Sequence, residues 1–459
     1  MLYNRSFTVW SMALFIAWAL CFPFFGCVLN ATLKPNGFSS DAFAYIFLGF
    51  HALGYVCGVI IEKKLDHWMQ IMRISLITVL AVNILLWFIP LNLWYIGLAI
   101  LGFASAFYIL GWSLPFTKYD PAERFLIIIK TTIQAILVAA PLVVLSFLLS
   151  PYYFIYLTTA PLAVIMIILI KSNQQKKDEI IDVKANKSFS NTSMLILFLF
   201  IIMMYLNFGI LYGDLPYLFN ISNNFPMVCA LYILIPSLIV YSLILRYHHK
   251  IARHYLLSTG IALTGLAYVS LIFFDDDVTS YILTATLLQT GLSLIHLLIW
   301  SLLGDLAHIF GKPIRFFGYN LIASVTGIIF GGTFGKFLFI KTGTPKVFIS
   351  IFALATICVA IIVLPWLKEN LDMINRATLL QKTRRNSALL NITDEPGLTK
   401  REKEVIDKLI QGLENKVIAR QLFICETTLK THLRSIYKKF EVGNKSEFLA
   451  KVVRKMDQQ

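Results

Sequence analysis

The sequence predicts an all-α protein in two parts: a polytopic helical membrane bundle of about twelve spans, followed by a small domain of four helices. Of its 459 residues, 58% are hydrophobic and only 14% are charged, with a mean hydropathy of +0.73. A soluble globular protein carries about a quarter charged residues. The last fifth of the chain, after Leu367, holds 19 of the 40 lysines and arginines. This composition excludes an ordinary soluble enzyme, a disordered tail and a disulfide-stapled secreted domain.

The predicted membrane domain, residues 1–367, consists of apolar runs separated by short polar loops. A run of about 20 apolar residues is needed to cross a hydrocarbon core of about 30 Å. The expected spans are residues 7–29, 42–61, 72–90, 93–113, 125–148, 151–170, 194–213, 226–245, 255–274, 279–303, 316–340 and 346–366.

The distribution of basic residues between the loops predicts the orientation of this bundle. Alternate loops hold sixteen lysines and arginines, whereas the opposite loops hold three and an acidic run at residues 275–277. Basic loops remain on the cytoplasmic side of a membrane. We therefore expect a multi-pass protein of the cell's inner (cytoplasmic) membrane, embedded in the lipid bilayer, with both termini in the cytoplasm.

The longest polar loop, residues 171–193, divides the spans six and six. This arrangement, with a basic central loop, resembles the major facilitator superfamily of transporters. The resemblance implies two halves that rock about a binding site at the membrane midplane. The superfamily's motif after the second span keeps its glycine and acid here, as Gly58 and Glu62, but lacks the later glycine and the arginine cluster. This departure weighs against active transport, and the lack of an acid near the middle of any span weighs against proton coupling.

Polar side chains inside membrane spans are costly, and they indicate either function or helix-to-helix bonding. Four of them are candidates for a small-molecule pocket: His51, Asn207, Gln289 and His296. The alternative for Asn207 and Gln289 is a bridge to a neighbouring helix. For the two histidines the alternative is a satisfied position in the interior.

Other motifs in the chain indicate packing rather than chemistry. Gly327, Gly331 and Gly335 lie four residues apart, a spacing that lets two helices approach closely. Packing is favoured for them over a gating seam or a dimer contact. The six cysteines form no CxxC pair and no Cys/His ligand spacing, and neither a phosphate-binding glycine loop nor a nucleophile elbow is present. We therefore expect no metal, no cofactor and no enzymatic activity.

Residues 398–459 form the second predicted domain, after a linker at residues 368–397. Thr399 and Glu402 match a capping box at the start of its first helix. Its third helix is expected from about Glu426 to Phe440. One face of that helix is apolar, with Leu429, Leu433, Ile436 and Phe440 at helical spacing.

The opposite face of this third helix carries hydroxyl groups and long cations. It holds Thr427, Thr428, Lys430, Thr431, Arg434, Lys438 and Lys439. A helix fits a DNA major groove about 12 Å wide, where such side chains reach phosphates and base edges. Residues 398–459 carry a net charge of +6, which suits a polyanion. The alternative is a solvated amphipathic helix without a nucleic-acid partner.

The stretch LTKREKEVIDKLIQGLENKVIARQL, followed by TLKTH and IYKKF, resembles the LuxR-type (NarL/FixJ-type) helix-turn-helix domain over its whole length. The resemblance implies binding to double-stranded DNA as a homodimer, through the fourth helix, on paired half-sites about one helical turn apart. It assigns base recognition to Lys430, Thr431 and Arg434. It assigns phosphate contacts to Lys416, Thr427, Thr428, Lys438 and Lys445.

Three positions depart from this family's pattern. Phe423 occupies a turn position that is often glycine, Cys425 replaces the usual capping serine, and Glu441 stands where a glycine is expected after the third helix. We expect each departure to weaken a helix cap by about 1 kcal/mol and to leave the base contacts in place.

Three functions remain open from the sequence. The preferred one is a membrane-embedded one-component transcription regulator, in which the bundle senses a small molecule or a membrane state and controls DNA binding by the C-terminal helices. The second is a major-facilitator-type transporter with a DNA-binding regulatory tail, and the third is a membrane anchor for a constitutive DNA binder. Activators of the resembled family also contact RNA polymerase, although no residue here is assigned to that contact.

Overall fold

The computed structural model describes most of the chain as helix. The described residues are 5–24, 26–62, 67–172, 191–210, 226–248, 251, 253–273, 277–342, 347–363, 365–366, 397–410, 415–445, 447–448 and 451. The chain divides into two compact units, with Tyr3–Lys368 in one and Glu369–Gln459, together with Met1–Leu2, in the other. The predicted linker at 368–397 lies outside the described residues except for Gly397.

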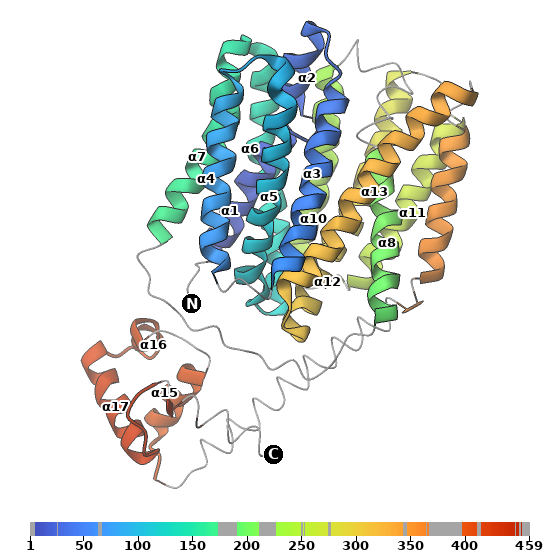
Figure 1. Ribbon diagram of the computed structural model, residues 1–459. Helices are drawn as coiled ribbons and strands as arrows, with labels where there is room; N and C mark the ends of the chain where they lie inside the picture. The colour runs from blue at the N-terminus through green and yellow to red at the C-terminus, as the bar shows by residue number, and fades with distance from the viewer. Residues whose placement is uncertain are drawn as a thin grey trace. The chain divides into compact units, whose positions relative to one another are not determined.

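The first half of the membrane unit is a bundle of long helices joined by short turns (Figure 1). It contains α1 (Arg5–Cys21), α2 (Cys27–Leu33), α3 (Ser40–Ile61), α4 (Trp68–Leu86), α5 (Trp94–Thr117), α6 (Pro121–Leu148) and α7 (Phe154–Ser172), with the 3₁₀ turns η1 (Lys34–Asn36), η3 (Leu91–Leu93) and η4 (Pro151–Tyr153).

The second half repeats this architecture. It contains α8 (Asn191–Gly209), α10 (Pro226–Tyr247), α11 (Arg253–Phe273), α12 (Val278–Phe310), α13 (Pro313–Thr342) and a helix at Val347–Val363. Among the described residues, seven helices are long and apolar enough to cross a membrane, and five shorter apolar helices accompany them. Each of the twelve predicted spans overlaps one of these helices, and the described residues form no strand, so the all-α fold class is confirmed.

The first predicted span, residues 7–29, is interrupted in the structure. Helix α1 ends at Cys21 and α2 begins at Cys27. Pro23 lies in the turn between them, where its missing N–H and its ring prevent a continuous helix. The apolar run at 7–29 therefore contains two helices, a division that hydropathy does not reveal because it is insensitive to a single proline.

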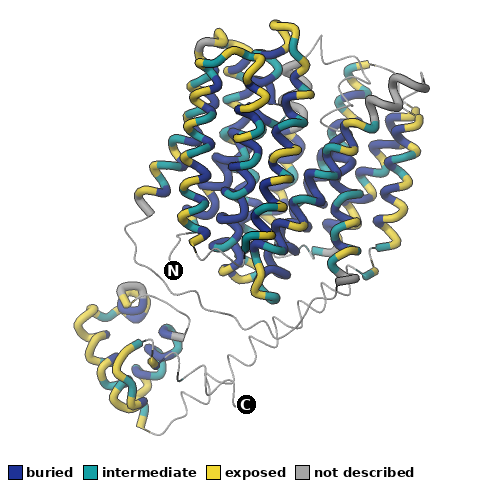
Figure 2. The backbone as a smooth tube through the Cα atoms, viewed as in Figure 1, coloured by how far each residue is buried: buried dark blue, intermediate teal, exposed yellow. Residues whose placement is uncertain are grey.

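Burial in the membrane unit follows the pattern expected for lipid as the solvent. Large apolar side chains such as Ile60, Phe88 and Phe273 are more than two-thirds exposed. Buried and exposed stretches alternate along the helices of the bundle (Figure 2). Polar side chains are bonded inside it, since unpaired polar groups are costly away from water. Asn83, for example, accepts from the indole N–H of Trp18 at 3.1 Å and donates to Thr158 at 3.2 Å.

The predicted close approach at the glycine repeat occurs between α13 and α8. A Cβ atom added to Gly331 would lie 2.0 Å from the carbonyl oxygen of Leu206, and one added to Gly327 would lie 2.5 Å from that of Ile202. Backbone therefore packs on backbone, which is the packing role predicted for these residues.

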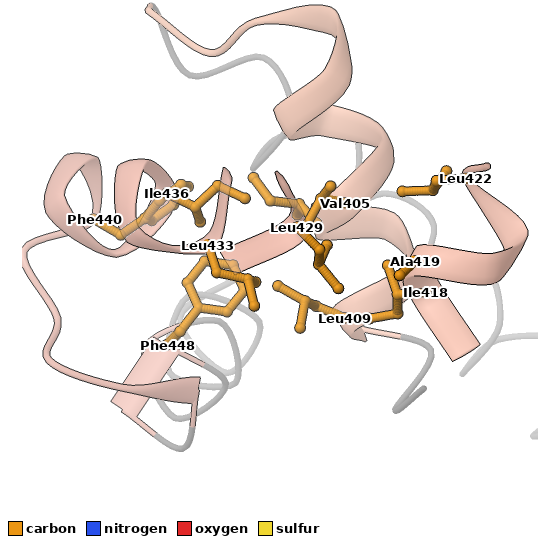
Figure 3. Packing of buried hydrophobic residues seen from close by; sticks show 11 residues of the cluster. Val405, Leu409, Ile418, Ala419, Leu422, Leu429, Leu433, Ile436, Phe440 and Phe448 are labelled. Carbon is orange, nitrogen blue, oxygen red and sulfur yellow. The ribbon is translucent and has the colours of Figure 1, made fainter. Parts of the chain in front are cut away.

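The C-terminal unit contains three described helices, α15 (Lys400–Ile410), α16 (Asn415–Gln421) and α17 (Glu426–Lys439), and a further helical segment that starts at Lys445. Their apolar faces meet in one core (Figure 3). The predicted capping box is present: the Thr399 N–H donates to Glu402 Oε2 at 2.7 Å, and the Glu402 N–H donates to Thr399 Oγ1 at 3.2 Å. The core consists of Val405, Ile406, Leu409, Ile418, Ala419, Leu422, Leu429, Leu433, Ile436, Phe440 and Phe448.

Candidate functional site

Helix α17 has one face buried in the domain core and one face open to solvent. Leu429, Leu433 and Ile436 are at most 5% exposed. They anchor the helix, so the residues between them point outward. The outward, exposed set comprises Thr427, Thr428, Lys430, Thr431, Arg434 and Lys438. The structure thus gathers the three predicted base-reading residues and three of the predicted phosphate-contacting residues on one surface.

The remaining predicted DNA-contacting residues are placed differently. Lys439 Nζ lies 2.6 Å from the Oε2 atom of Glu402, which is almost fully buried, so its charge is already paired within the domain. Lys439 remains exposed on α17, and helical spacing alone does not reveal its carboxylate partner across the domain. Lys445 is half-buried, and the side chain of Lys416 lies outside the described residues.

Glu402 connects α15 to α17 through several hydrogen bonds. Its carboxylate accepts from Ser435 Oγ at 2.6 Å as well as from Lys439. Burial alone raises the pKa of this carboxyl group, but the bonds from Lys439, Ser435 and Thr399 outweigh burial and hold the pKa at about 2. Glu402 therefore remains ionised at neutral pH and links α15 to α17.

The start of α17 lacks a side-chain cap, which agrees with the expected effect of a cysteine in place of the usual capping serine. Cys425 occupies the N-cap position, and its side chain accepts no bond from the helix backbone. The sulfur lies 3.0 Å from Thr427 Oγ1 and 2.9 Å from Thr428 Oγ1. Hydrogen bonds from these two hydroxyl groups lower the pKa of the Cys425 thiol to about 7.

Phe423 and Glu441 occupy the left-handed backbone region at the two ends of α17. Their φ angles are 53° and 49°, and among the described residues they are the non-glycine positions with positive φ. A side chain with a Cβ atom is strained in this region. These are the two positions where the sequence departs from an expected glycine, and the structure shows that both turns keep the geometry that glycine favours.

A second candidate site is a cavity of about 230 Å³ within the membrane unit. Side chains from α1, α3, α5 and α6 of the first half and from α8, α12 and α13 of the second half line it. The lining is largely aliphatic and aromatic. Two of the predicted pocket residues, His51 and His296, lie in this lining, one from each half of the bundle.

Each of the two histidines is held by a tyrosine. The Tyr55 hydroxyl lies 2.8 Å from Nε2 of His51, whose Nδ1 lies 2.8 Å from Ser105 Oγ. The Tyr205 hydroxyl lies 2.8 Å from Nδ1 of His296 and accepts from the indole N–H of Trp300 at 3.2 Å. Sequence reasoning missed both tyrosines, because aromatic residues are frequent in apolar spans and carry no spacing signal of their own.

Asn207 and Gln289 are not among the residues that line this cavity. The Asn207 amide donates to the Met203 carbonyl at 2.9 Å and to Thr356 at 3.4 Å, and the Gln289 amide donates to Ser237 at 2.6 Å. Both amides thus make the bridging contacts between helices that are the alternative to a ligand role. The two histidines line the cavity, and the two amides lie outside its lining.

Ion pairs join the two halves where the basic loops emerge. Arg124 of α6 lies 2.8 Å from Asp305 of α12, and the second carboxylate oxygen of Asp305 lies 2.8 Å from Arg253 of α11. Arg124 and Asp305 are at most 2% exposed. Glu62, the acid of the predicted motif, lies 2.8 Å from Arg315 of α13. The pairs Arg124–Asp305 and Glu62–Arg315 each join a helix of the first half to a helix of the second.

Comparison with known proteins separates the two units. Residues 396–452 match the family described as bacterial regulatory proteins, luxR family. Over 57 residues the chain is 49% identical to the CsgBAC operon transcriptional regulatory protein of Escherichia coli, a match that covers 12% of this chain and 26% of that protein. The chain thus spans about a quarter of the length of the curated relatives it matches.

The membrane unit resembles solved transporters in fold. The human organic anion transporter MFSD10 aligns with a TM-score of 0.62 and 11% identity, over 78% of this chain and 98% of that one. The major facilitator superfamily transporter FucP, in the outward conformation, aligns with a TM-score of 0.56 and 13% identity, over 77% and 97%. Families of regulators and transporters are not typical enzymes. Residues 396–452 are thus a LuxR-family helix-turn-helix domain, and the membrane-spanning region before them has the major facilitator fold.

Proposed function

We propose that this protein is a membrane-embedded one-component transcription regulator. The observation that carries the proposal is α17, whose buried leucines fix an exposed face of cations and hydroxyl groups within a LuxR-family domain. The relatives that share this domain include the CsgBAC operon transcriptional regulatory protein of Escherichia coli and the monoamine regulon transcriptional regulator of Klebsiella aerogenes. In this proposal α17 lies in the major groove of double-stranded DNA, with Lys430, Thr431 and Arg434 at base edges.

Phosphate contacts orient the helix on the duplex. Thr427, Thr428 and Lys438 supply them from the exposed surface, and Lys416 and Lys445 extend the same set. The domain acts as a homodimer on paired half-sites, and contact with RNA polymerase completes activation. Tethering of the domains to one membrane surface, the cytoplasmic face of the inner membrane, raises their effective concentration for each other.

The membrane unit supplies the input in this proposal. The cavity receives side chains from both halves, so a small molecule that contacts both halves stabilises one arrangement over the other. A ligand shifts a conformational equilibrium only through such differential affinity. The observation that supports sensing is the joint lining of one cavity by His51 and His296.

A transporter with a DNA-binding tail is the second candidate, favoured by the cavity between two halves of a major facilitator fold. The described residues that line the cavity include no Asp or Glu, which weighs against proton-driven transport. Concentrative uptake of a cavity ligand into proteoliposomes would establish this alternative, and binding without uptake supports the regulator.

Chromatin immunoprecipitation of the full-length protein tests DNA binding, followed by gel retardation on an enriched fragment. Lys430→Ala with Arg434→Ala is expected to abolish retardation, whereas Lys408→Ala, which removes a cation of α15, is expected to change it little. Retardation also falls steeply between about 50 and 200 mM salt, because phosphate contacts release counterions. Equal retardation by the double variant, or no enriched chromosomal site, refutes the proposal.

A further inference from the structure

We propose that the cavity binds a small uncharged aromatic molecule that carries one hydroxyl or carbonyl group, and that Thr131 and His296 recognise that group. This inference rests on the proposed sensing function and names the class of ligand that the membrane unit takes. Thr131 comes from α6 in the first half, and His296 from α12 in the second.

The size and lining of the cavity favour one aromatic ring. An engineered apolar cavity of about 150 Å³ binds benzene, and the volume here is about 230 Å³. A single ring with a short substituent therefore fits, whereas a multi-ring molecule does not. Aromatic side chains surround the space, and they favour edge and stacked contacts with a ring. They are Phe15, Phe24, Phe47, Tyr55, Trp112, Tyr205 and Trp300.

Most polar atoms in the lining are already bonded within the protein. Both nitrogens of His51 lie within hydrogen-bond distance of Tyr55 and Ser105. Thr132 Oγ1 donates to the Ile128 carbonyl at 3.0 Å, and Ser324 Oγ donates to the Asn320 carbonyl at 2.9 Å. The indole N–H of Trp112 donates to the Thr8 carbonyl at 2.8 Å, and that of Trp300 donates to Tyr205. These groups shape the cavity and leave little capacity for a ligand.

Two lining groups have hydrogen-bonding capacity to spare. Thr131 is 3% exposed, and its Oγ1 has no hydrogen-bond partner in the described part of the chain. The imidazole of His296 bonds Tyr205 through Nδ1, and its Nε2 has no partner among the described residues. Buried polar groups are almost always bonded, so an unpaired one calls for an explanation. A ligand oxygen between the two halves satisfies both groups at once.

The charges and hydrogen bonds of the lining residues exclude other classes of ligand. No Asp, Glu, Lys or Arg is among the described lining residues, so a charged ligand would lose its hydration without gaining a counter-charge. A sugar would bury many hydroxyl groups against only two unpaired protein groups. A pure hydrocarbon fits the walls but leaves Thr131 unpaired. An aromatic alcohol, phenol or ketone is uncharged, carries a single polar group and offers Thr131 a hydrogen-bond partner.

Equilibrium dialysis of the full-length protein in lipid nanodiscs tests the proposal, with radiolabelled benzyl alcohol, toluene, benzoate and glucose as probes. Saturable binding of one benzyl alcohol per chain is expected, with toluene about five-fold weaker because it lacks the hydrogen bond. Benzoate and glucose are expected not to saturate. Thr131→Val should weaken benzyl alcohol about five-fold and leave toluene unchanged, and unchanged toluene binding also reports an intact fold.

Thr132→Val is the matched control, since it makes the same chemical change one residue away, at a hydroxyl group that is already bonded. It should leave both affinities unchanged. His296→Phe should act like Thr131→Val. Absence of saturable benzyl alcohol binding, tighter binding of benzoate or glucose, or equal effects of the two threonine variants would overturn the proposal.

Gel retardation with the same preparation separates the two proposals. If the protein retards DNA but does not bind benzyl alcohol, only the proposed ligand class is refuted. Binding of benzyl alcohol by a protein that retards no DNA refutes the regulator and leaves the site in place.

Discussion

Replacement of Glu402 by Gln removes the charge that joins α15 to α17. The carboxylate is 3% exposed, and its bonds to Lys439 and Ser435 are both 2.6 Å long. Its pKa falls from an ordinary 4.5 to about 2. One pKa unit corresponds to about 1.4 kcal/mol, so the ionised form contributes about 3 kcal/mol to the stability of the domain.

The sign of the pH dependence follows from the lowered pKa. The unfolded chain binds a proton at Glu402 near pH 4.5 and the folded chain near pH 2. The contribution is therefore fully present above about pH 5 and is lost as the pH falls toward 2. In Glu402→Gln this part of the acid sensitivity disappears together with the stability.

Pulse proteolysis of the full-length protein in urea, with detection of a C-terminal tag, measures this effect. The midpoint for the C-terminal domain should fall by the equivalent of about 3 kcal/mol in Glu402→Gln. Glu404→Gln is the control, because that carboxylate is 39% exposed in its pair with Arg401 and should cost less than about 1 kcal/mol. A loss below about 1 kcal/mol for Glu402→Gln, or a wild-type stability that does not change between pH 5 and 3, would refute this account of the ion pair.

Three further predictions follow from the strained turns, the capping thiol and the buried ion pair. Phe423→Gly and Glu441→Gly should each stabilise the domain by about 1 kcal/mol in the same urea assay, because each removes a Cβ atom that is strained at positive φ. Phe423 is 95% exposed, so its replacement loses no packing. Destabilisation by either change would contradict the strain. The alkylation rate of Cys425 by iodoacetamide should reach half of its maximum near pH 7, whereas a midpoint in the ordinary thiol range would contradict the bonds from its hydroxyl neighbours. Asp305→Asn leaves Arg124 buried without its counter-charge, and it should destabilise the membrane unit by about 3–5 kcal/mol. A thermal unfolding assay in detergent measures this loss. An unchanged unfolding temperature would show that the pair is not buried.

Prediction from the sequence succeeded for properties that depend on the residues of a single helix. The twelve apolar runs and the buried face of α17 follow from residue type and periodicity within a single helix, and the structure confirms both. The break at Pro23 was missed, because a hydropathy window averages over the residue that interrupts the helix.

The sequence does not specify the contacts that a side chain makes with a second helix. Lys439 shares the spacing of the exposed cations, yet it pairs with Glu402, 37 positions earlier in the chain. Asn207 and His296 are both polar residues in apolar spans. Packing of the helices gives the asparagine a bond to Thr356 and leaves the histidine at the cavity.

The amino-acid sequence by itself determined the solvent of each unit, the number of apolar helices and the face that each amphipathic helix presents, because these depend on composition and on the period of 3.6 residues. Only the tertiary structure decided which polar groups are satisfied. Thr131 and Thr132 are indistinguishable in sequence, but the hydroxyl of Thr132 bonds its own helix and that of Thr131 faces the cavity without a partner. The physical reason is that residue type and helical period do not specify how the packed helices orient each hydroxyl group, and this orientation decides whether the group meets a partner.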